Sequence, residues 1–171
     1  MMNVGFRAMT EDDLPAIRAW LQQPHVREWW GDPDEQYALL DGDRDEPAMD
    51  QYIMLMEGEP AGYLQCYALT QWNDGFGPQP EGTRGIDLFI SGPQRVGRGH
   101  GSLVLRAFCN LMFQRGVPRV VTDPSPANAR AIRAYEKAGF RRERVVHTPD
   151  GPALLMSCEP ADLPRRPSEP S

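Results

Sequence analysis

Residues 94–102 form a glycine-rich stretch that could bind a ligand. Its sequence is Gln-Arg-Val-Gly-Arg-Gly-His-Gly-Ser. Glycines at alternate positions let successive backbone N–H groups converge without obstruction by Cβ atoms, and a helix predicted to begin near Gly101 adds the positive end of its dipole. Arg95 and Arg98 add positive charge. The stretch is therefore predicted to bind an anion such as a pyrophosphate, with a merely flexible strand-to-helix connection as the alternative.

The spacing of these glycines disfavours two common phosphate-binding loops. It is not Gly-x-Gly-x-x-Gly, and no Gly-Lys-Ser/Thr follows to supply a lysine and a magnesium ligand. Dinucleotide-binding and NTP-binding proteins are therefore weaker interpretations.

Asn128 and Tyr135 form a second pair of residues able to act on a ligand. They are seven positions apart. This spacing is a rotation of about 700° at roughly 100° per residue, so both project from one face of the helix predicted over 128–138. An amide at this position can hold part of a ligand, and a phenol further along can act as an acid. The alternative for Tyr135 is a core aromatic residue whose hydroxyl reaches solvent.

Two aspartates could recognise a positively charged group. Asp87 lies inside a predicted strand, where aspartate is disfavoured. Asp123 directly follows the next predicted strand, at the end where open α/β sheets form their ligand crevice. Together they would bind a cation. The alternatives are a solvent-facing strand position for Asp87 and a helix N-terminal acid, before Pro124, for Asp123.

These residues are carried by a chain in which strands and helices alternate. Apolar residues at period two predict strands, and apolar residues at helical spacing predict helices. The predicted strands are 4–8, 51–56, 61–69, 84–90, 119–122, 140–148 and 153–159, and the predicted helices are one beginning near Thr10, then 24–30, 101–115 and 128–138. The strand, helix, strand, helix order of the second half implies at least one parallel strand pair.

Two segments are predicted to lack fixed structure. Residues 31–50 are so rich in acids and prolines that we expect a mobile, solvated segment that could overhang the site. The tail from Pro160 is expected to be disordered for the same reason, which leaves residues 1–160 as a single domain and residues 161–171 as the tail.

Composition narrows the class of protein. The chain has 171 residues, 40% of them hydrophobic, enough to bury one core. Its 18 basic and 24 acidic residues give a formal charge of −6, which disfavours nucleic acid as a partner and favours cations. No apolar run is long enough to span a membrane. We therefore expect a cytoplasmic protein, either a monomer or a homodimer.

The cysteines and histidines do not predict a metal site. Cys66, Cys109 and Cys158 lack the spacing of metal ligands and are interpreted as reduced core thiols. The three histidines, His25, His100 and His147, are interpreted as surface or loop residues. No metal is expected.

The glycine-rich stretch resembles the Gln/Arg-x-x-Gly-x-Gly/Ala signature of the GNAT superfamily of acetyltransferases, which Gln94, Gly97 and Gly99 match. Asn128 and the run from Tyr135 to Phe140 resemble a second feature of that family. The resemblance implies the GNAT acyltransferase fold, an α/β (mixed α+β) architecture with a mostly antiparallel central sheet, a central parallel strand pair and flanking helices.

The same resemblance implies acetyl-CoA as the co-substrate. The residues implied to bind it are Gln94, Arg95, Val96, Gly97, Arg98, Gly99, His100, Gly101, Ser102 and, on the pantetheine arm, Asn128. When an amine attacks the thioester a thiolate departs, and a phenol within hydrogen-bond range can protonate its sulfur. Tyr135 is the predicted acid.

A closer resemblance, to the aminoglycoside 6'-N-acetyltransferases, covers most of residues 5–157. It is carried by Glu28-Trp29-Trp30-Gly31, Asn73-Asp74-Gly75, Arg84-Gly85-Ile86-Asp87, the run from Thr122 to Asn128, and Thr148-Pro149-Asp150-Gly151-Pro152. The resemblance implies that Trp30 lines the site, that Asp87 is the base, and that the drug's amines contact Asp74, Asp87, Asp123 and Asp150.

Two aromatic positions are interpreted differently. Trp29 is interpreted as a core anchor. Phe76 is followed by Gly77, where similar enzymes continue with aromatic residues, so weaker or differently aimed stacking on the substrate is expected.

These residues lead to one favoured function and two alternatives. The favoured one is transfer of an acetyl group from acetyl-CoA to the 6'-amine of aminoglycosides by direct attack of the amine, which would confer antibiotic resistance. Acetylation of another small amine, such as a siderophore precursor or a polyamine, would leave the CoA half unchanged. A non-catalytic CoA-binding regulatory module is the alternative from another class, and the presence of Asp87 and Tyr135 argues against it.

Overall fold

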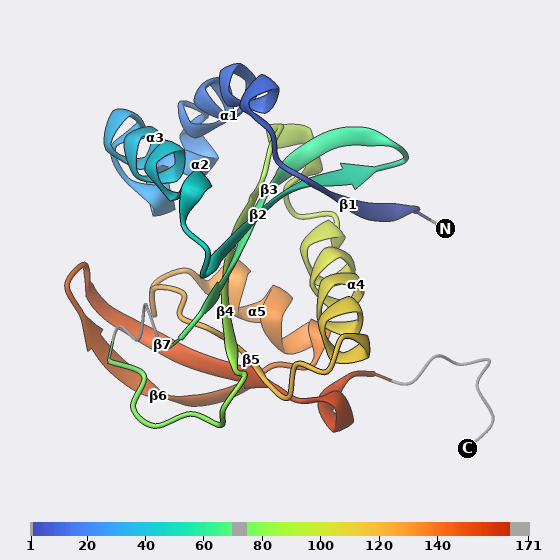
Figure 1. Cartoon of the computed structure of the whole chain (residues 1–171), viewed down its shortest axis with the longest axis vertical. Coiled ribbons are helices and arrows are strands. Elements are labelled where there is room, and N and C mark those ends of the chain that lie inside the picture. The colour runs from blue at the N-terminus through green and yellow to red at the C-terminus, as the bar shows by residue number, and fades with distance from the viewer. Residues whose placement is uncertain (1, 70–74, 165–171) are drawn as a thin grey trace.

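A seven-stranded mixed sheet organises the chain in a computed structural model that describes residues 2–69 and 75–164 (Figure 1). The strands are β1 (Val4–Ala8), β2 (Met49–Met56), β3 (Glu59–Ala68), β4 (Arg84–Ile90), β5 (Val120–Thr122), β6 (Arg141–Thr148) and β7 (Gly151–Cys158). The helices are α1 (Leu14–Leu21), α2 (Pro24–Trp30), α3 (Pro33–Gly42), α4 (His100–Gln114) and α5 (Ala129–Ala138). The strand order is β1-β2-β3-β4-β5-β7-β6.

The predicted elements are confirmed, with strand ends that differ by at most two residues from those expected. Every neighbouring pair of strands is antiparallel except β4 and β5, which are parallel. The predicted mostly antiparallel sheet with one central parallel pair is therefore the observed one. The helix expected near Thr10 begins with a 3-10 turn over Glu11–Asp13, which α1 continues.

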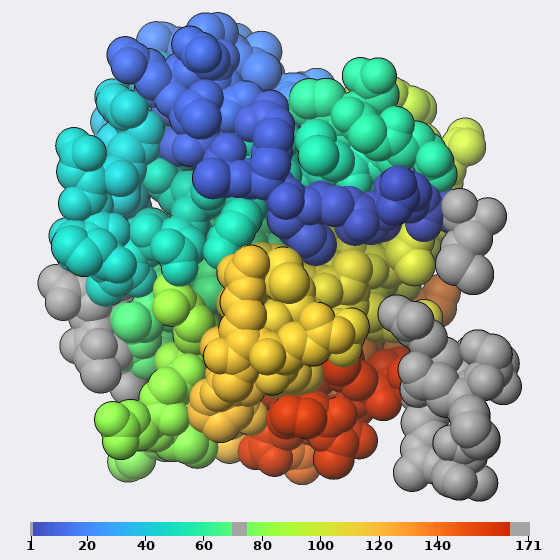
Figure 2. Space-filling view, turned by 45° about the vertical axis from the view of Figure 1, so that its right-hand side comes forward, coloured from blue at the N-terminus to red at the C-terminus, as the bar shows by residue number. Residues whose placement is uncertain are grey.

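Alternation along the strands divides the core between two faces of the sheet. On one face, the apolar sides of α4 and α5 pack against residues such as Met54, Leu64 and Ile86. On the other, α1, α2 and α3 pack against Ile53, Tyr63 and Phe89. In Figure 1 the blue-to-cyan helices α1–α3 gather at the upper left, away from α4 and α5. Figure 2 shows α4 and the segment after it, in yellow and gold, between the blue N-terminal strand and the red C-terminal residues.

The parallel pairing of β4 with β5 is short. Its register covers only Arg84 with Val120 and Gly85 with Val121, although β4 continues to Ile90. One side-chain contact continues the connection, because the Thr122 hydroxyl donates to the Ile86 carbonyl at 3.1 Å. The sheet therefore opens between β4 and β5 at the level of Asp87 and Leu88.

The expectation of a mobile segment over residues 31–50 is wrong. Most of this segment is helix α3 and a 3-10 turn over Asp43–Asp45, and Met49 already begins β2. The Asp32 carboxylate accepts a hydrogen bond from the Glu35 amide at 3.0 Å, so an acid that suggested solvation is the N-cap of the helix. Leu40 is buried in the core beneath α1 and α2.

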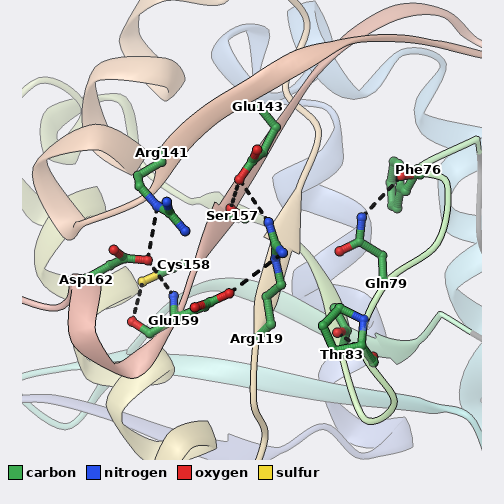
Figure 3. Close-up of polar contacts among 11 residues, drawn as sticks. Phe76, Gln79, Thr83, Arg119, Arg141, Glu143, Ser157, Cys158, Glu159 and Asp162 are labelled. Atoms are coloured by element: carbon green, nitrogen blue, oxygen red, sulfur yellow. Dashed lines mark hydrogen bonds and ion pairs between the residues drawn. The ribbon is translucent and has the colours of Figure 1, made fainter.

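The expectation of disorder from Pro160 is wrong for residues 160–164. Pro160–Asp162 form a 3-10 turn, and the Asp162 carboxylate accepts from the Glu159 amide at 2.9 Å and lies 3.3 Å from the Arg141 guanidinium (Figure 3). Leu163 packs against the main core. The remainder of the predicted tail, residues 165–171, lies outside the described residues.

A polar network fixes the neighbouring hairpin. Arg119 pairs with Glu143 at 2.8 Å and with Glu159 at 3.7 Å, and the buried Ser157 hydroxyl donates to Glu143 (Figure 3). These contacts join the chain before β5 to β6 and to the end of β7. They position the β6–β7 hairpin beside the opening of the sheet.

The three cysteines are buried and unbridged, as predicted. Burial raises the pKa of the Cys66 thiol to about 11. Among residues 2–69 and 75–164, no group of three or more His, Cys, Asp or Glu side chains could hold a metal ion. Within the same residues, none of the helices combines the length and apolarity needed to cross a bilayer.

Replacing Leu40 by alanine tests whether α3 is packed. Leu40 is 3% exposed and its neighbour Leu39 is 61% exposed. We expect Leu40→Ala to lower the free energy of unfolding by about 2–5 kcal/mol, because a buried leucine leaves a cavity, whereas Leu39→Ala should change it by less than about 0.5 kcal/mol. Denaturant unfolding of the two variants measures both values, and equal small changes would contradict the packing of this helix.

Candidate active site

Two cavities meet where the sheet opens. The first, of about 550 Å³, lies between α3, the opened strands and the β6–β7 turn, and the second, of about 520 Å³, lies between α2, the glycine-rich loop and α5. Six of the described residues line both: Trp29, Trp30, Leu88, Asn128, Ala131 and Tyr135. A ligand in the second cavity can therefore meet a ligand in the first at Asn128 and Tyr135.

The glycine-rich loop has the backbone that an anion cradle requires. Gly97 and Gly99 have φ of +79° and +77°, a region that favours glycine, and an added Cβ at either position would meet no atom within 4 Å. Gly99 is the N-cap of α4, and the first-turn residues, whose amides have no acceptor within the helix, line the second cavity. An added Cβ at Gly101 would lie 3.4 Å from the Ala134 Cβ, so α4 and α5 lie close together at this position.

Most of the predicted cofactor residues line the second cavity. These are Arg95, Val96, Gly97, Gly99, His100, Gly101, Ser102 and Asn128. Gln94 and Arg98 are exposed and do not line this cavity. The Arg95 guanidinium donates to the Ser91 carbonyl at 2.9 Å, which holds this charge at the edge of the loop.

Asn128 plays a structural part that the sequence analysis did not separate from ligand binding. Its side-chain oxygen accepts from the Ala131 amide at 3.2 Å and thereby caps α5, which begins at Ala129. Because this oxygen serves the cap, the amide nitrogen is the group suited to donate to a ligand. The side chain lies at the junction of the two cavities.

Tyr135 is buried in α5, with its ring edge-on to Phe140 at 5.2 Å between centroids. Burial raises the pKa of its hydroxyl, a hydrogen bond with Thr122 lowers the pKa, and the charges of Asp87 and Asp123 raise it further. The net shift is upward, so the phenol stays protonated.

Carboxylates gather on the first cavity. Asp87 from β4, Asp123 after β5 and Asp150 from the β6–β7 turn all line it, and Gln65 donates to Asp87 at 3.0 Å. Helix α5 begins at Ala129, so Asp123 does not cap a helix, and the alternative interpretation of this residue is wrong. The fourth predicted acid, Asp74, lies outside the described residues.

One of the aromatic predictions, that for Trp29, is wrong. Trp30 packs edge-on against Phe89, with centroids 5.1 Å apart, and lines both cavities. Trp29, interpreted as a core anchor, is instead 42% exposed and also lines both cavities. Phe76 is fully buried against residues such as Leu155, so its ring is unavailable for stacking on a ligand.

The prediction for one histidine is wrong. His25 is a half-buried residue of α2, not a loop residue, and its Nε2 lies 2.8 Å from the Ile90 carbonyl oxygen. This bond fastens α2 to the end of β4. His100 is half-buried at the first position of α4, and His147 is exposed in β6.

Several residues of the first cavity belong to no motif and were not predicted from the sequence. They are Gln36, Leu39, Leu40 and Asp43 from α3 and the turn after it, and Gln65 and Tyr67 from β3. The signal for α3 was present as Asp32-Pro33-Asp34-Glu35, an N-cap followed by proline and first-turn acids. Burial, with the charge of Glu46, raises the pKa of the Asp43 carboxyl, as expected for an acid in a partly closed cavity.

Comparison with known proteins gives consistent results. The acetyltransferase (GNAT) domain family matches residues 9–148. An aminoglycoside N(6')-acetyltransferase type 1 of Klebsiella pneumoniae is 40% identical over 164 residues, which cover 90% of this chain and 82% of that protein. A kanamycin resistance protein of Rhizobium radiobacter is 50% identical over 76 residues, which cover 44% of this chain and 70% of that protein.

Solved structures agree in fold over nearly the whole chain. The structure of AAC(6')-Ib in complex with parmomycin and acetyl-CoA superposes with a TM-score of 0.84 at 39% identity, covering 98% of this chain and 99% of that one. The structure of AAC(6')-Ib with coenzyme A and kanamycin has a TM-score of 0.82 at 39% identity, covering 94% and 96%.

Substitution of Gly99 tests the anion cradle. An alanine at φ of +77° would strain the loop by about 1–2 kcal/mol, so we expect Gly99→Ala to weaken coenzyme A binding by about 5- to 30-fold. Gly5→Ala is the control, because its added Cβ meets no atom within 4 Å and its φ is ordinary. Calorimetric titration with coenzyme A measures both, and unchanged affinity in Gly99→Ala would argue against the cradle.

Proposed function

Because this chain belongs to the acetyltransferase (GNAT) family, we propose that it transfers the acetyl group of acetyl-CoA to the 6'-amine of aminoglycosides. One observation carries the proposal: a glycine-cradled cavity and a carboxylate-lined cavity meet at Asn128 and Tyr135. A thioester whose diphosphate lies at the first turn of α4 can then face an amine bound among aspartates.

The second cavity suits coenzyme A. The amides of the first turn of α4 and the guanidinium of Arg95 would hold the diphosphate, and the amide nitrogen of Asn128 would donate to the pantetheine arm. Arg130, Arg133 and Lys137 also line this cavity and add positive charge. The thioester would then reach the junction beside Tyr135.

The first cavity suits a polycation. Asp43, Asp87, Asp123 and Asp150 lie on its different walls, so several amines of one ligand could each meet a carboxylate. Relatives named for aminoglycoside acetylation and neighbours with aminoglycosides bound support this class of acceptor. A linear polyamine would satisfy the same charges, but the exposed ring of Trp29 offers a flat surface that suits a sugar ring.

The chemistry follows from two groups, Asp87 in the first cavity and Tyr135 at the junction of the two. Asp87 takes a proton from the bound ammonium, directly or through water, and the amine nitrogen then forms a bond to the thioester carbonyl carbon. The amine nitrogen loses its second proton to solvent as the carbon–sulfur bond breaks. Tyr135 donates its proton to the departing thiolate and is reprotonated from solvent. Cysteine is missing from the described lining of both cavities, which supports direct attack rather than an acetyl-enzyme.

A substrate pair tests the acceptor and its position. We expect purified protein with acetyl-CoA to release coenzyme A thiol in the presence of kanamycin. An aminoglycoside with a hydroxyl in place of the 6'-amine should release little or none, because its oxygen is far less nucleophilic than a neutral amine. Thiol release and the mass of the product measure the outcome. Turnover with polyamines and none with kanamycin would favour the alternative small-amine function.

Substitution of Asp87 and of Tyr135 tests the mechanism. Asp87→Asn should lower kcat by about 10²–10⁴, the usual range for loss of a general base, while the affinity for acetyl-CoA changes less than about twofold, because Asp87 does not line the second cavity. Tyr135→Phe should likewise lower kcat. Equal losses of turnover and acetyl-CoA affinity in Asp87→Asn would contradict its role as a base.

Asp43 offers a test of polycation recognition at a position that sequence analysis missed. Asp43→Asn should raise KM for a polycationic acceptor by about 3- to 10-fold, the size of a partly screened ion pair, and should leave KM for acetyl-CoA unchanged. Asp45→Asn is the matched control, because Asp45 lies in the same turn but does not line the cavity. Steady-state kinetics of both variants decide, and equal effects would assign the change to overall charge.

A further inference from the structure

A continuous line of hydrogen bonds runs from α3 to Asp87. The Gln51 side-chain nitrogen donates to the Leu40 carbonyl at 2.8 Å and to the Tyr63 hydroxyl oxygen at 3.0 Å. The Tyr63 hydroxyl donates to the Gln65 side-chain oxygen at 2.9 Å, and the Gln65 nitrogen donates to Asp87 at 3.0 Å. Every donor between Gln51 and Asp87 therefore points toward the carboxylate.

The sheet register accounts for this line. Gln51 and Gln65 are directly opposed on β2 and β3, and Gln65 and Asp87 are directly opposed on β3 and β4. Three neighbouring strands thus present three polar side chains in one row on one face. Tyr63 precedes Gln65 by two residues, so it lies on the same face and its hydroxyl reaches the row.

Tyr63 determines which way the Gln65 amide faces. If this amide were reversed, its NH₂ group would face a hydroxyl that already accepts from Gln51, the Tyr63 hydrogen would lose its acceptor, and the Gln65 oxygen would face the Asp87 carboxylate. Each of these changes is unfavourable in a buried site. The Tyr63 hydroxyl therefore keeps a donor directed at Asp87.

Packing keeps the Tyr63 hydroxyl in place. The side chain is fully buried, with its ring 5.7 Å from that of Phe89 and 6.2 Å from that of Trp30 between centroids. Burial raises the pKa of this phenol, and the hydrogen bond from Gln51 only partly opposes the shift, so the hydroxyl remains a donor. A donor chain of fixed direction strengthens each of its bonds.

We propose that Tyr63 and Gln51 are positioning residues that orient the Gln65 amide and, through it, the Asp87 carboxylate for proton removal from the amine. The line also joins this orientation to α3, because Gln51 holds the Leu40 carbonyl at the end of that helix. The inference rests on the proposed role of Asp87 as the base. It adds residues that do not touch the acceptor: neither Tyr63 nor Gln51 lines the first cavity.

A double-mutant cycle tests the proposal. Tyr63→Phe retains the ring and removes the hydroxyl, and we expect kcat to fall about tenfold, the value of one buried hydrogen bond, with KM for acetyl-CoA unchanged. In the Asp87→Asn background the same substitution should have no further effect on kcat, because the carboxylate it orients is gone. A purely structural role of Tyr63 would instead give the same loss in both backgrounds.

Two further variants provide a control and a second test of the positioning role. Tyr52→Phe is the control: it removes a half-buried hydroxyl from β2, where the ring packs edge-on against Phe108 on the other face, and kcat should change less than about twofold. Gln51→Met removes the donor to Tyr63 without shortening the side chain. It should lower kcat about threefold and carries the test if Tyr63→Phe does not fold, as thermal melting would reveal.

The outcomes separate the two proposals. If Asp87→Asn leaves kcat unchanged, the role of the base itself fails. If Asp87→Asn lowers kcat but Tyr63→Phe and Gln51→Met either leave it unchanged or lower it equally in both backgrounds, only the positioning role is overturned.

Discussion

The short pairing between β4 and β5 is the constraint on which the site depends. Two parallel residue pairs hold the strands together before they separate, and each backbone group beyond that point needs another partner. The Thr122 hydroxyl donates a hydrogen bond to the Ile86 carbonyl, and a ring nitrogen of His25 is hydrogen-bonded to the Ile90 carbonyl. Leu88 lies between these two fastened positions and lines both cavities. A continuous strand pair would close the space in which the two substrates would meet.

The same opening separates charges of opposite sign. On one side lie the carboxylates of the first cavity, and on the other lie Arg95, Arg130, Arg133, Lys137 and the first-turn amides of α4. The formal charge of −6 is that of the whole chain and does not give the local charge of either cavity. Because each cavity repels the ligand suited to the other, the arrangement favours one orientation of an anionic co-substrate and a cationic acceptor.

Sequence alone predicted the parts of the structure that depend on local rules. Alternate glycines, period-two strands and the helical spacing of α5 each leave a signature within a few residues, so the loop at Gly97 and Gly99 and the seven described strands were predicted. Helix α3 was not, because the same acids and prolines that cap a helix also describe a solvated segment. The burial of Leu40 under α1 distinguishes a packed helix from a solvated segment here, and this long-range contact is not encoded in local composition. The assignment of Trp29 to the core failed for the same reason, because only tertiary packing decides which of two neighbouring rings faces the core.

The catalytic residues expected from the sequence are also held in place by residues that carried no motif. The Asp87 carboxylate is held by a line of hydrogen bonds through Gln51, Tyr63 and Gln65. The Tyr135 hydroxyl is in contact with Thr122. In both cases the supporting group lies on a neighbouring element of the sheet, so its contribution follows from register and not from sequence spacing. The two supports act on different properties. The Gln65 amide directs a donor at the Asp87 carboxylate and keeps that group in place. The contact with Thr122 instead lowers the pKa of the Tyr135 hydroxyl, against burial and the charges of Asp87 and Asp123, so the buried phenol gives up its proton more readily than it would without Thr122.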